Sequence, residues 1–429
     1  MSGTESKTLA TRVAPPQAGP VDGIRRALVL SGGGARGAYE AGVLQFVFGP
    51  LARRLGFTPH LDIYTGSSVG AVNACFLAAH ADDLAAGAEG LVRIWREMAF
   101  ARVYSFGLTD AGRFAQTFAS SVWGRSAGIR RHPSRLPGLL NTKPLEELVV
   151  RTIPWRRLRK NVYEGKLEAL SVSTTQIATG RTVNFVQNRA REIPTWTRDG
   201  SNIAVATRIG PLHTLASAAI PMLFPAVRIG GTYYVDGSLR QATPLTPALR
   251  LGANRILIIG LRRNQFASLE EPLADERVRK FRTLGFLVGK LLNAVLSDRL
   301  ENDVAHMRVL NALMQAGVDS YGTAHLDDIN PFVQAQRGHS FQIVSDAFVR
   351  PSEDLGAVAA HHVARIRRAP PGSILGNLAF RALTRGDPAG EADLMSYLLF
   401  DGRYAEDLIR LGARDAAAQE EELAQLFLD

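Results

Sequence analysis

The segment Gly66-Ser67-Ser68-Val69-Gly70 decides the fold expected for this chain. It fits the pattern G-x-S-x-G, in which a serine occupies a sharp turn between a strand and a helix. Residues 61–65 read as a short strand before it, and the small residues at 69–79 read as a helix after it. The two glycines suit so tight a turn, because a β-carbon at either place would collide with the neighbouring backbone. Ser68 is therefore a candidate nucleophile at a helix N-terminus, where developing negative charge is favoured.

A second glycine-rich segment precedes this turn in the chain. Residues 27–30 are an apolar run typical of a strand buried on both faces, and they lead directly into Ser31-Gly32-Gly33-Gly34-Ala35-Arg36-Gly37. A helix is predicted next, because apolar residues recur at the spacing of one buried stripe. The order strand, glycine loop, helix, strand, elbow and helix predicts an α/β unit with a parallel sheet. The stripe consists of Leu44, Val47, Phe48, Leu51 and Leu55.

The glycine loop has two interpretations. Gly32, Gly34 and Gly37 satisfy G-x-G-x-x-G, the dinucleotide fingerprint, but the second strand ends in the elbow and not in the acidic residue that would hold a ribose. Alternatively, the loop is an oxyanion hole, in which backbone N–H groups of Gly33, Gly34 and their neighbours stabilise the charge on an attacked carbonyl. Arg36 would then either hold a substrate phosphate or carboxylate, or fasten the loop through backbone carbonyls.

A nucleophilic serine needs a base, and the sequence offers two kinds. An α/β-hydrolase places its histidine late in the chain, which makes His339 or His361 a candidate. An aspartate acting alone is the other option. Asp236 ends the hydrophobic strand 232–235, where a desolvated carboxylate can accept a hydroxyl proton. Asp401 also follows an apolar run and is the weaker competitor.

Composition and charge restrict the partners. The chain of 429 residues has 50 Lys and Arg against 40 Asp and Glu, a net charge of +10. This balance favours loose attraction to polyanions such as an anionic membrane surface. No zinc-ligand spacing and no aromatic-interleaved basic motif occurs, so neither a metal nor a nucleic-acid partner is expected. The single cysteine, Cys75, excludes an internal disulfide and is expected to be a buried core thiol.

The predicted organisation has three parts. Residues 1–22 are expected to be a flexible lead-in, 23–262 a catalytic domain, and 263–429 a mainly helical region packed on it. No secretory signal or membrane-spanning stretch is recognised, so we expect a cytoplasmic protein with peripheral membrane contact. An amphipathic segment at 286–296 fits either a helix packed on the core or a lid that touches a membrane. Further strands are expected at 167–175, 182–186, 226–229, 256–259 and 341–344, and further helices at 91–98, 145–151, 212–219, 353–368 and 404–427.

Four blocks of sequence together resemble the patatin-like phospholipases, a family of serine lipid acyl hydrolases. They are the glycine loop 32–37, the elbow 66–70, the block 216–221 (Ala-Ser-Ala-Ala-Ile-Pro) with Phe224-Pro225, and Asp236-Gly237. Their order and spacing suit the family, and they fall within roughly residues 27–260. One departure is Ser238, where the family usually has Gly or Ala.

The resemblance implies a three-layer sandwich with a mostly parallel central sheet flanked by helices. It also implies a dyad without histidine, in which Ser68 is the nucleophile and Asp236 the base, with no cofactor. The predicted activity is hydrolysis of acyl esters in a phospholipid or another lipid. A histidine-dependent esterase, a dinucleotide-binding protein and a non-catalytic lipid-binding module remain the alternatives.

Overall fold

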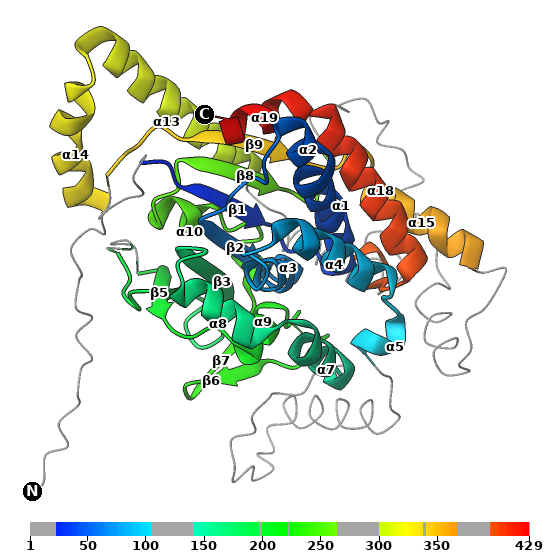
Figure 1. The fold of residues 1–429 in the computed structure, drawn as a ribbon. Coiled ribbons are helices and arrows are strands. Elements are labelled where there is room, and N and C mark those ends of the chain that lie inside the picture. Colours follow the sequence, from blue (N-terminus) through cyan, green and yellow to red (C-terminus); the bar gives the residue numbers. More distant parts are fainter. Residues whose placement is uncertain are drawn as a thin grey trace, which may run out of the picture.

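The computed structural model describes residues 23–104, 140–194, 196, 200–221, 223–263, 300–337, 340–366 and 395–428. Within these ranges the chain forms one nine-stranded sheet with helices on both faces (Figure 1). The predicted lead-in 1–22, the amphipathic segment 286–296 and His339 lie outside the described residues.

The sheet is mostly parallel. Its main path runs β5-β4-β3-β2-β1-β8-β9, and the hairpin β6-β7 joins it through β3. The pairs β1-β2, β2-β3, β1-β8, β8-β9 and β4-β5 are parallel, whereas β3-β4, β3-β7 and β6-β7 are antiparallel. The strands are β1 (Arg26–Leu30), β2 (Ile63–Ser67), β3 (Ala169–Gln176), β4 (Thr182–Asn188), β5 (Asn202–Ala206), β6 (Val227–Ile229), β7 (Thr232–Asp236), β8 (Arg255–Ile259) and β9 (Ser345–Val349).

The central strand β1 is apolar on both faces because helices cover both. Leu28 and Leu30 pack into one hydrophobic cluster with helices α1, α3, α4 and α18, whereas Ala27 and Val29 pack into a second cluster with α10 and α13. The architecture is therefore helix, sheet and helix in three layers, as predicted. These helices are α1 (Ala38–Phe46), α3 (Val69–Ala78), α4 (Leu84–Arg96), α10 (Leu245–Arg250), α13 (Leu300–Tyr321) and α18 (Gly402–Ala418).

The remaining described helices cover the edges of these layers. They include the short helices α2 (Ala52–Leu55) and α5 (Phe100–Val103), the pair α7 (Lys143–Thr152) and α8 (Trp155–Tyr163), and α9 (Pro211–Ser217). Towards the C-terminus follow α14 (Ala324–Arg337), α15 (Leu355–Ile366) and α19 (Glu420–Leu428). None of the helices in the described part of the chain combines the length and apolar character that a membrane crossing requires.

Most predicted elements are present, with three corrections. The strand expected at 341–344 is wrong, since those residues are not in a strand and β9 follows them from Ser345 to Val349. The helix expected at 91–98 begins earlier, at Leu84, where the Asp83 side chain accepts a hydrogen bond from the Ala86 N–H. The helix that carries the apolar stripe 44–55 is interrupted by a π-helical segment at Val47–Leu51. This segment contains Pro50, which has no N–H to continue the α-helical hydrogen bonds.

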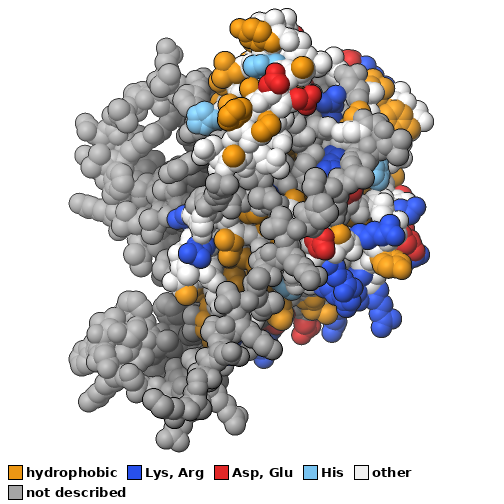
Figure 2. All heavy atoms as spheres, turned by 90° about the vertical axis from the view of Figure 1, so that its left-hand side faces the viewer, with side chains coloured by type: hydrophobic (Ala, Val, Ile, Leu, Met, Phe, Trp, Pro, Cys, Tyr) orange, Lys and Arg blue, Asp and Glu red, His pale blue; other side chains and the backbone are white. Residues whose placement is uncertain are grey.

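The C-terminal part of the chain contributes to the sheet as well as to the helical layers. Strand β9 pairs in parallel with β8, and α18 lies along α1 (Figure 1). The Tyr39 hydroxyl of α1 donates a 3.0 Å hydrogen bond to Asp415 of α18, and both side chains are buried. The long helices α13 and α14 extend away from the sheet, and large apolar side chains on them are exposed, among them Tyr321 and Phe332. Figure 2 shows hydrophobic side chains on this upper part of the molecule.

Candidate active site

Ser68 lies in a strained turn between β2 and α3. Its backbone has φ 52° and ψ −125°, a conformation that residues with a side chain rarely adopt. The turn is tight enough that a β-carbon on Gly70 would lie 2.5 Å from the Leu30 carbonyl oxygen, and one on Gly66 would lie 2.6 Å from the Ala71 Cα. Glycine at both positions is therefore required by close packing of the backbone, as predicted.

The Ser68 side chain is hydrogen-bonded to Asp236. Its Oγ donates to Asp236 Oδ2 over 2.6 Å, and the two residues are only 4% and 1% exposed. Asp236 reaches this place because β7 pairs antiparallel with the end of β3, where Asp236 lies opposite Thr174. Strand β3 in turn pairs in parallel with β2, which carries the elbow. The sheet register thus brings together the two residues predicted as nucleophile and base.

Asp236 is held by several groups at the end of β7. Its Oδ1 accepts a 2.8 Å hydrogen bond from the Ser238 N–H, and its own N–H donates to the Ala219 carbonyl. Burial raises the pKa of this carboxyl to about 6, and hydrogen bonds from Ser68 and Ser238 offset part of that effect. A carboxyl with a pKa near 6 is charged at neutral pH yet basic enough to accept a hydroxyl proton.

Ser217 fastens the elbow from the opposite side. The Ser68 backbone N–H donates to Ser217 Oγ over 2.9 Å, and Ser217 Oγ donates to the Ser173 carbonyl over 2.6 Å. All three residues are buried. Sequence reasoning did not give Ser217 a role, although the block 216–221 was one of the four that carried the family resemblance. Its function here is to connect the elbow to α9 and β3.

The glycine loop packs directly against Ser68. A β-carbon on Gly32 would collide with Ser238 Oγ and would lie 2.9 Å from the Ser68 Cβ. The Gly32 N–H donates to the Ala242 carbonyl over 2.8 Å, so it is engaged within the fold. Gly33 and Gly34 instead cap and begin the short 3₁₀ helix Gly34–Gly37, and N–H groups at a helix start have no partner inside that helix.

Arg36 connects the glycine loop to the C-terminal part of the chain. Its guanidinium is buried and donates to Ser396 Oγ through Nε and Nη2, over 2.9 and 2.6 Å, and to the Tyr397 hydroxyl over 3.3 Å. It also lies over the Tyr397 ring, 3.9 Å from its centroid. The sequence suggested a substrate anion or backbone carbonyls as partners of Arg36, and the structure adds two hydroxyl side chains. Gly37 completes the loop against Val69, the residue after Ser68.

The competing bases in the described part of the chain, His361 and Asp401, lie away from Ser68. Among the described residues, no histidine is hydrogen-bonded to Ser68 or Asp236, and His361 is exposed on α15. Asp401 caps α18 by accepting hydrogen bonds from the N–H groups of Arg403 and Tyr404. Its Oδ1 also lies 3.0 Å from His362 Nε2. Within the described ranges no three His, Cys, Asp or Glu side chains gather as a set that could hold a metal ion.

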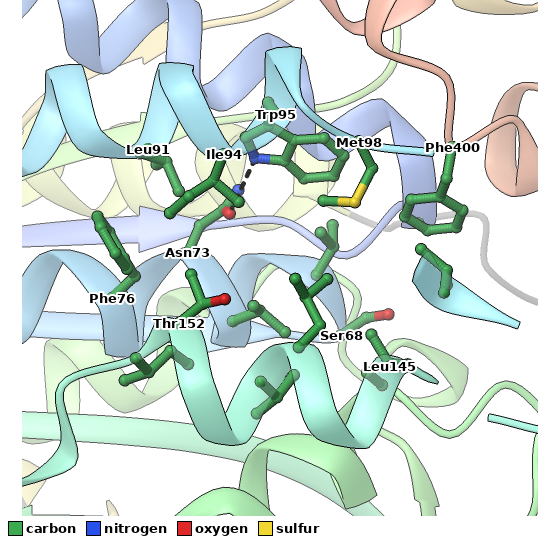
Figure 3. A pocket seen from close by; sticks show the side chains of 18 of the residues that line it. Ser68, Asn73, Phe76, Leu91, Ile94, Trp95, Met98, Leu145, Thr152 and Phe400 are labelled. Carbon is green, nitrogen blue, oxygen red and sulfur yellow. Dashed lines mark hydrogen bonds between the residues drawn. The ribbon is translucent and has the colours of Figure 1, made fainter. Parts of the chain in front are cut away.

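An apolar pocket opens beside Ser68 (Figure 3). It lies between α3, α4 and α7, encloses about 70 Å³, and is closed at one side by Phe400. Its polar lining includes Asn73, whose Oδ1 accepts a hydrogen bond from the Trp95 indole N–H. The apolar wall consists of Val69, Val72, Phe76, Leu91, Ile94, Met98, Val103, Leu145, Leu148, Val149, Ile153, Ala218, Ile220 and Phe224.

Two of the solved structures that match this chain resemble it only weakly. VipD from Legionella pneumophila is 12% identical, with 95% of this chain and 72% of that chain covered, at a TM-score of 0.27. ExoU of the type III secretion system of Pseudomonas aeruginosa, solved in complex with SpcU, is 16% identical at a TM-score of 0.26. That match covers 84% of this chain but only 61% of the ExoU chain. No curated protein matched the sequence.

The match to a protein family is more specific. The family model described as Patatin-like phospholipase matches residues 28–249, which is more than half of the 429 residues. This range contains the glycine loop, the elbow, Ser217 and Asp236, whereas Ser396, Tyr397 and Phe400 lie beyond it. The resemblance found in the sequence is confirmed: the chain belongs to the patatin-like phospholipase family.

Proposed function

We propose that this protein hydrolyses acyl ester bonds of lipids with a catalytic dyad of Ser68 and Asp236. The observation that carries the proposal is the 2.6 Å hydrogen bond from Ser68 Oγ to Asp236 Oδ2 in a buried, strained turn. Membership of the patatin-like phospholipase family supports lipid acyl hydrolysis in general. The residue roles rest on the geometry of the site.

In the first half-reaction Asp236 takes the proton of the Ser68 hydroxyl as Oγ attacks the acyl carbonyl carbon. The carbonyl oxygen becomes an oxyanion, and the N–H groups of Gly33 and Gly34 are its proposed donors. Collapse of this intermediate breaks the ester bond. The leaving alcohol takes the proton from Asp236, and the acyl group stays on Ser68.

In the second half-reaction water replaces the alcohol. Asp236 takes a proton from the water, whose oxygen attacks the acyl-serine carbonyl. The second tetrahedral intermediate collapses, the fatty acid leaves, and Ser68 Oγ regains its proton from Asp236. A carboxyl with a pKa of about 6 suits both directions of transfer near neutral pH.

The apolar pocket beside Ser68 supports a lipid as the substrate. Its wall is formed almost entirely by aliphatic and aromatic side chains, which would receive an acyl chain and exclude water from the reacting carbonyl. We infer that the substrate is a phospholipid or another acyl-ester lipid. Peripheral contact with an anionic membrane surface, favoured by the net charge of +10, stays a prediction.

Labelling with a fluorophosphonate, followed by peptide mapping, tests the proposal. We expect modification at Ser68, none in Ser68→Ala, and slow modification in Asp236→Asn. Hydrolysis of an acyl ester should be absent in Ser68→Ala and strongly reduced in Asp236→Asn. His361→Ala is the matched control and should behave as the wild type. Labelling at another residue, or dependence on His361, would overturn the dyad. Saturable binding of NAD or FAD without labelling would favour the dinucleotide alternative.

A further inference from the structure

Two buried polar side chains lie directly behind the glycine loop. Glu40 is in the first turn of α1, just after the loop, and is fully buried. Asn73 is on α3, five residues after Ser68, and is 1% exposed. The Asn73 amide Nδ2 donates to Glu40 Oε2 over 2.8 Å. The two helices that begin at the loop and at the elbow are thus joined through this pair.

The pair contacts the loop at both ends. Asn73 Nδ2 also donates to the Gly37 carbonyl over 3.1 Å, at the end of the loop. The backbone N–H of Ser31, at the start of the loop, lies close enough to the Glu40 carboxyl to stabilise its charged form. The remaining polar atom of the Asn73 side chain, Oδ1, accepts from Trp95 Nε1 over 3.3 Å (Figure 3). Asn73 therefore has hydrogen bonds for its donors and its acceptor at once.

We propose that Glu40 and Asn73 are positioning residues, which hold the loop 31–37 so that its N–H groups point at the oxyanion formed on the Ser68 adduct. The inference rests on the proposed function and assigns a role to residues that do not touch the substrate carbonyl. Donors must already be in place when charge develops, and a displacement near 1 Å costs roughly 100-fold in rate. Glycine allows many backbone conformations, so the position of a glycine-rich loop depends on contacts with its surroundings.

The direction in which the pKa of Glu40 is shifted fits this role. Burial raises the pKa of its carboxyl well above the ordinary value, and the hydrogen bond from Asn73 and the nearby Ser31 backbone N–H offset only part of that effect. A neutral carboxyl keeps an acceptor for Asn73 without placing a negative charge behind donors that must stabilise an oxyanion. Gln is neutral and keeps a carbonyl acceptor, so Glu40→Gln should preserve the arrangement.

The test compares a transition-state analogue with a ground-state analogue. A trifluoromethyl ketone with a long alkyl chain forms a tetrahedral adduct on Ser68 and uses the oxyanion donors, whereas an ether of the same chain only fills the pocket. For Glu40→Met and Asn73→Ala we expect kcat to fall roughly 10- to 100-fold and ketone affinity to fall in parallel. For Glu40→Met, KM and ether affinity should stay within about twofold. Asn73 also lines the pocket, so Asn73→Ala is judged by its ratio of ketone affinity to ether affinity. Glu40→Gln should keep most of the activity.

Tyr39→Phe is the matched control for stability. It removes the buried hydrogen bond to Asp415 from the same helix, without touching the loop. It should lower the melting temperature and leave the ketone-to-ether preference unchanged. If Asn73→Ala does not fold, Glu40→Met carries the test.

Two outcomes separate the hypotheses. If the wild type hydrolyses esters, and Glu40→Met and Asn73→Ala keep the wild-type ratio of ketone affinity to ether affinity, the pair is only structural and this inference is wrong. If the wild type neither hydrolyses esters nor forms the ketone adduct, the proposed function fails first, and the inference fails with it.

Discussion

Ser68 and Asp236 are 168 residues apart in the chain, yet their side chains meet over 2.6 Å in the interior of the protein. Neither is held by its own element alone. Ser68 is held by the hydrogen bond from its N–H to Ser217. Asp236 is held by the hydrogen bond that it accepts from the Ser238 N–H and by the one that its own N–H donates to Ala219. The geometry of this pair is the basis of the predictions below.

Replacing the proposed base should remove activity while a similar aspartate tolerates the same change. Asp236→Asn keeps the shape but cannot accept the Ser68 proton, so kcat for acyl ester hydrolysis should fall about 10²- to 10⁴-fold. Asp401→Asn is the control, because Asp401 caps α18 and Asn is also a good cap. It should stay within about twofold of the wild type. Equal losses in both variants would contradict the assigned roles.

The pH dependence should report the raised pKa of Asp236. Only the charged carboxylate can take a proton, so kcat/KM should be level above pH 6 and fall about tenfold per pH unit below the pKa of about 6. The measurement is initial rate at low substrate, with circular dichroism at each pH to show that the protein stays folded. If kcat/KM stays level down to about pH 4, the ordinary range of an aspartate, the pKa of Asp236 is not raised by burial and this prediction is wrong.

The same burial should reduce stability when Asp236 is charged. Because its folded-state pKa is about 6 and its ordinary value is 3.8, the folded state holds the proton more tightly than the unfolded state. That advantage is fully present below the lower value and is lost as pH rises through the higher one. The unfolding free energy of the wild type, relative to Asp236→Asn, should thus fall by about 3 kcal/mol across this window. Urea unfolding at several pH values measures it, and a rise would refute the assignment.

Alanine substitutions at two glycines with similar φ angles should distinguish the effect of backbone strain from the effect of displacing the glycine loop. Gly34 has φ +57° and Gly180 has φ +65°, but a β-carbon on Gly34 would collide with the Tyr397 carbonyl, whereas nothing lies within 4 Å at Gly180. Alanine at either position should cost about 1–2 kcal/mol of stability through strain alone. Only Gly34→Ala should also lower kcat, by at least about tenfold, since it moves the oxyanion loop. Unchanged kcat in Gly34→Ala would place the donors elsewhere.

A larger side chain in the apolar pocket should reduce the hydrolysis of long-chain esters more than that of short-chain esters. Leu148 of α7 lines the pocket, whereas Val150 of the same helix is 51% exposed. Leu148→Trp should lower kcat/KM for a palmitate ester by at least about tenfold and affect a butyrate ester much less. Val150→Trp should leave both unchanged. If Leu148→Trp affects the two esters equally, the acyl chain binds outside this pocket.

The sequence by itself determined those parts of the protein whose physical requirements are local. The elbow 66–70 needs glycine wherever a β-carbon would meet backbone, and this requirement is visible in five residues. The buried strand at 27–30 is visible because both of its faces are apolar. Asp236 was a candidate because it ends a hydrophobic strand, although the sequence offered Asp401 and two histidines beside it.

Only the tertiary structure shows which of the described candidates lies beside Ser68, because the contacts concerned join distant parts of the chain. The antiparallel register of β7 on β3 brings Asp236 to Ser68, whereas Asp401 is used to cap a helix. Arg36 meets Ser396 and Tyr397 across 360 residues or more, which no local pattern encodes. The raised pKa of Asp236 likewise comes from burial, a property of the packed sheet and helices and not of the residue type.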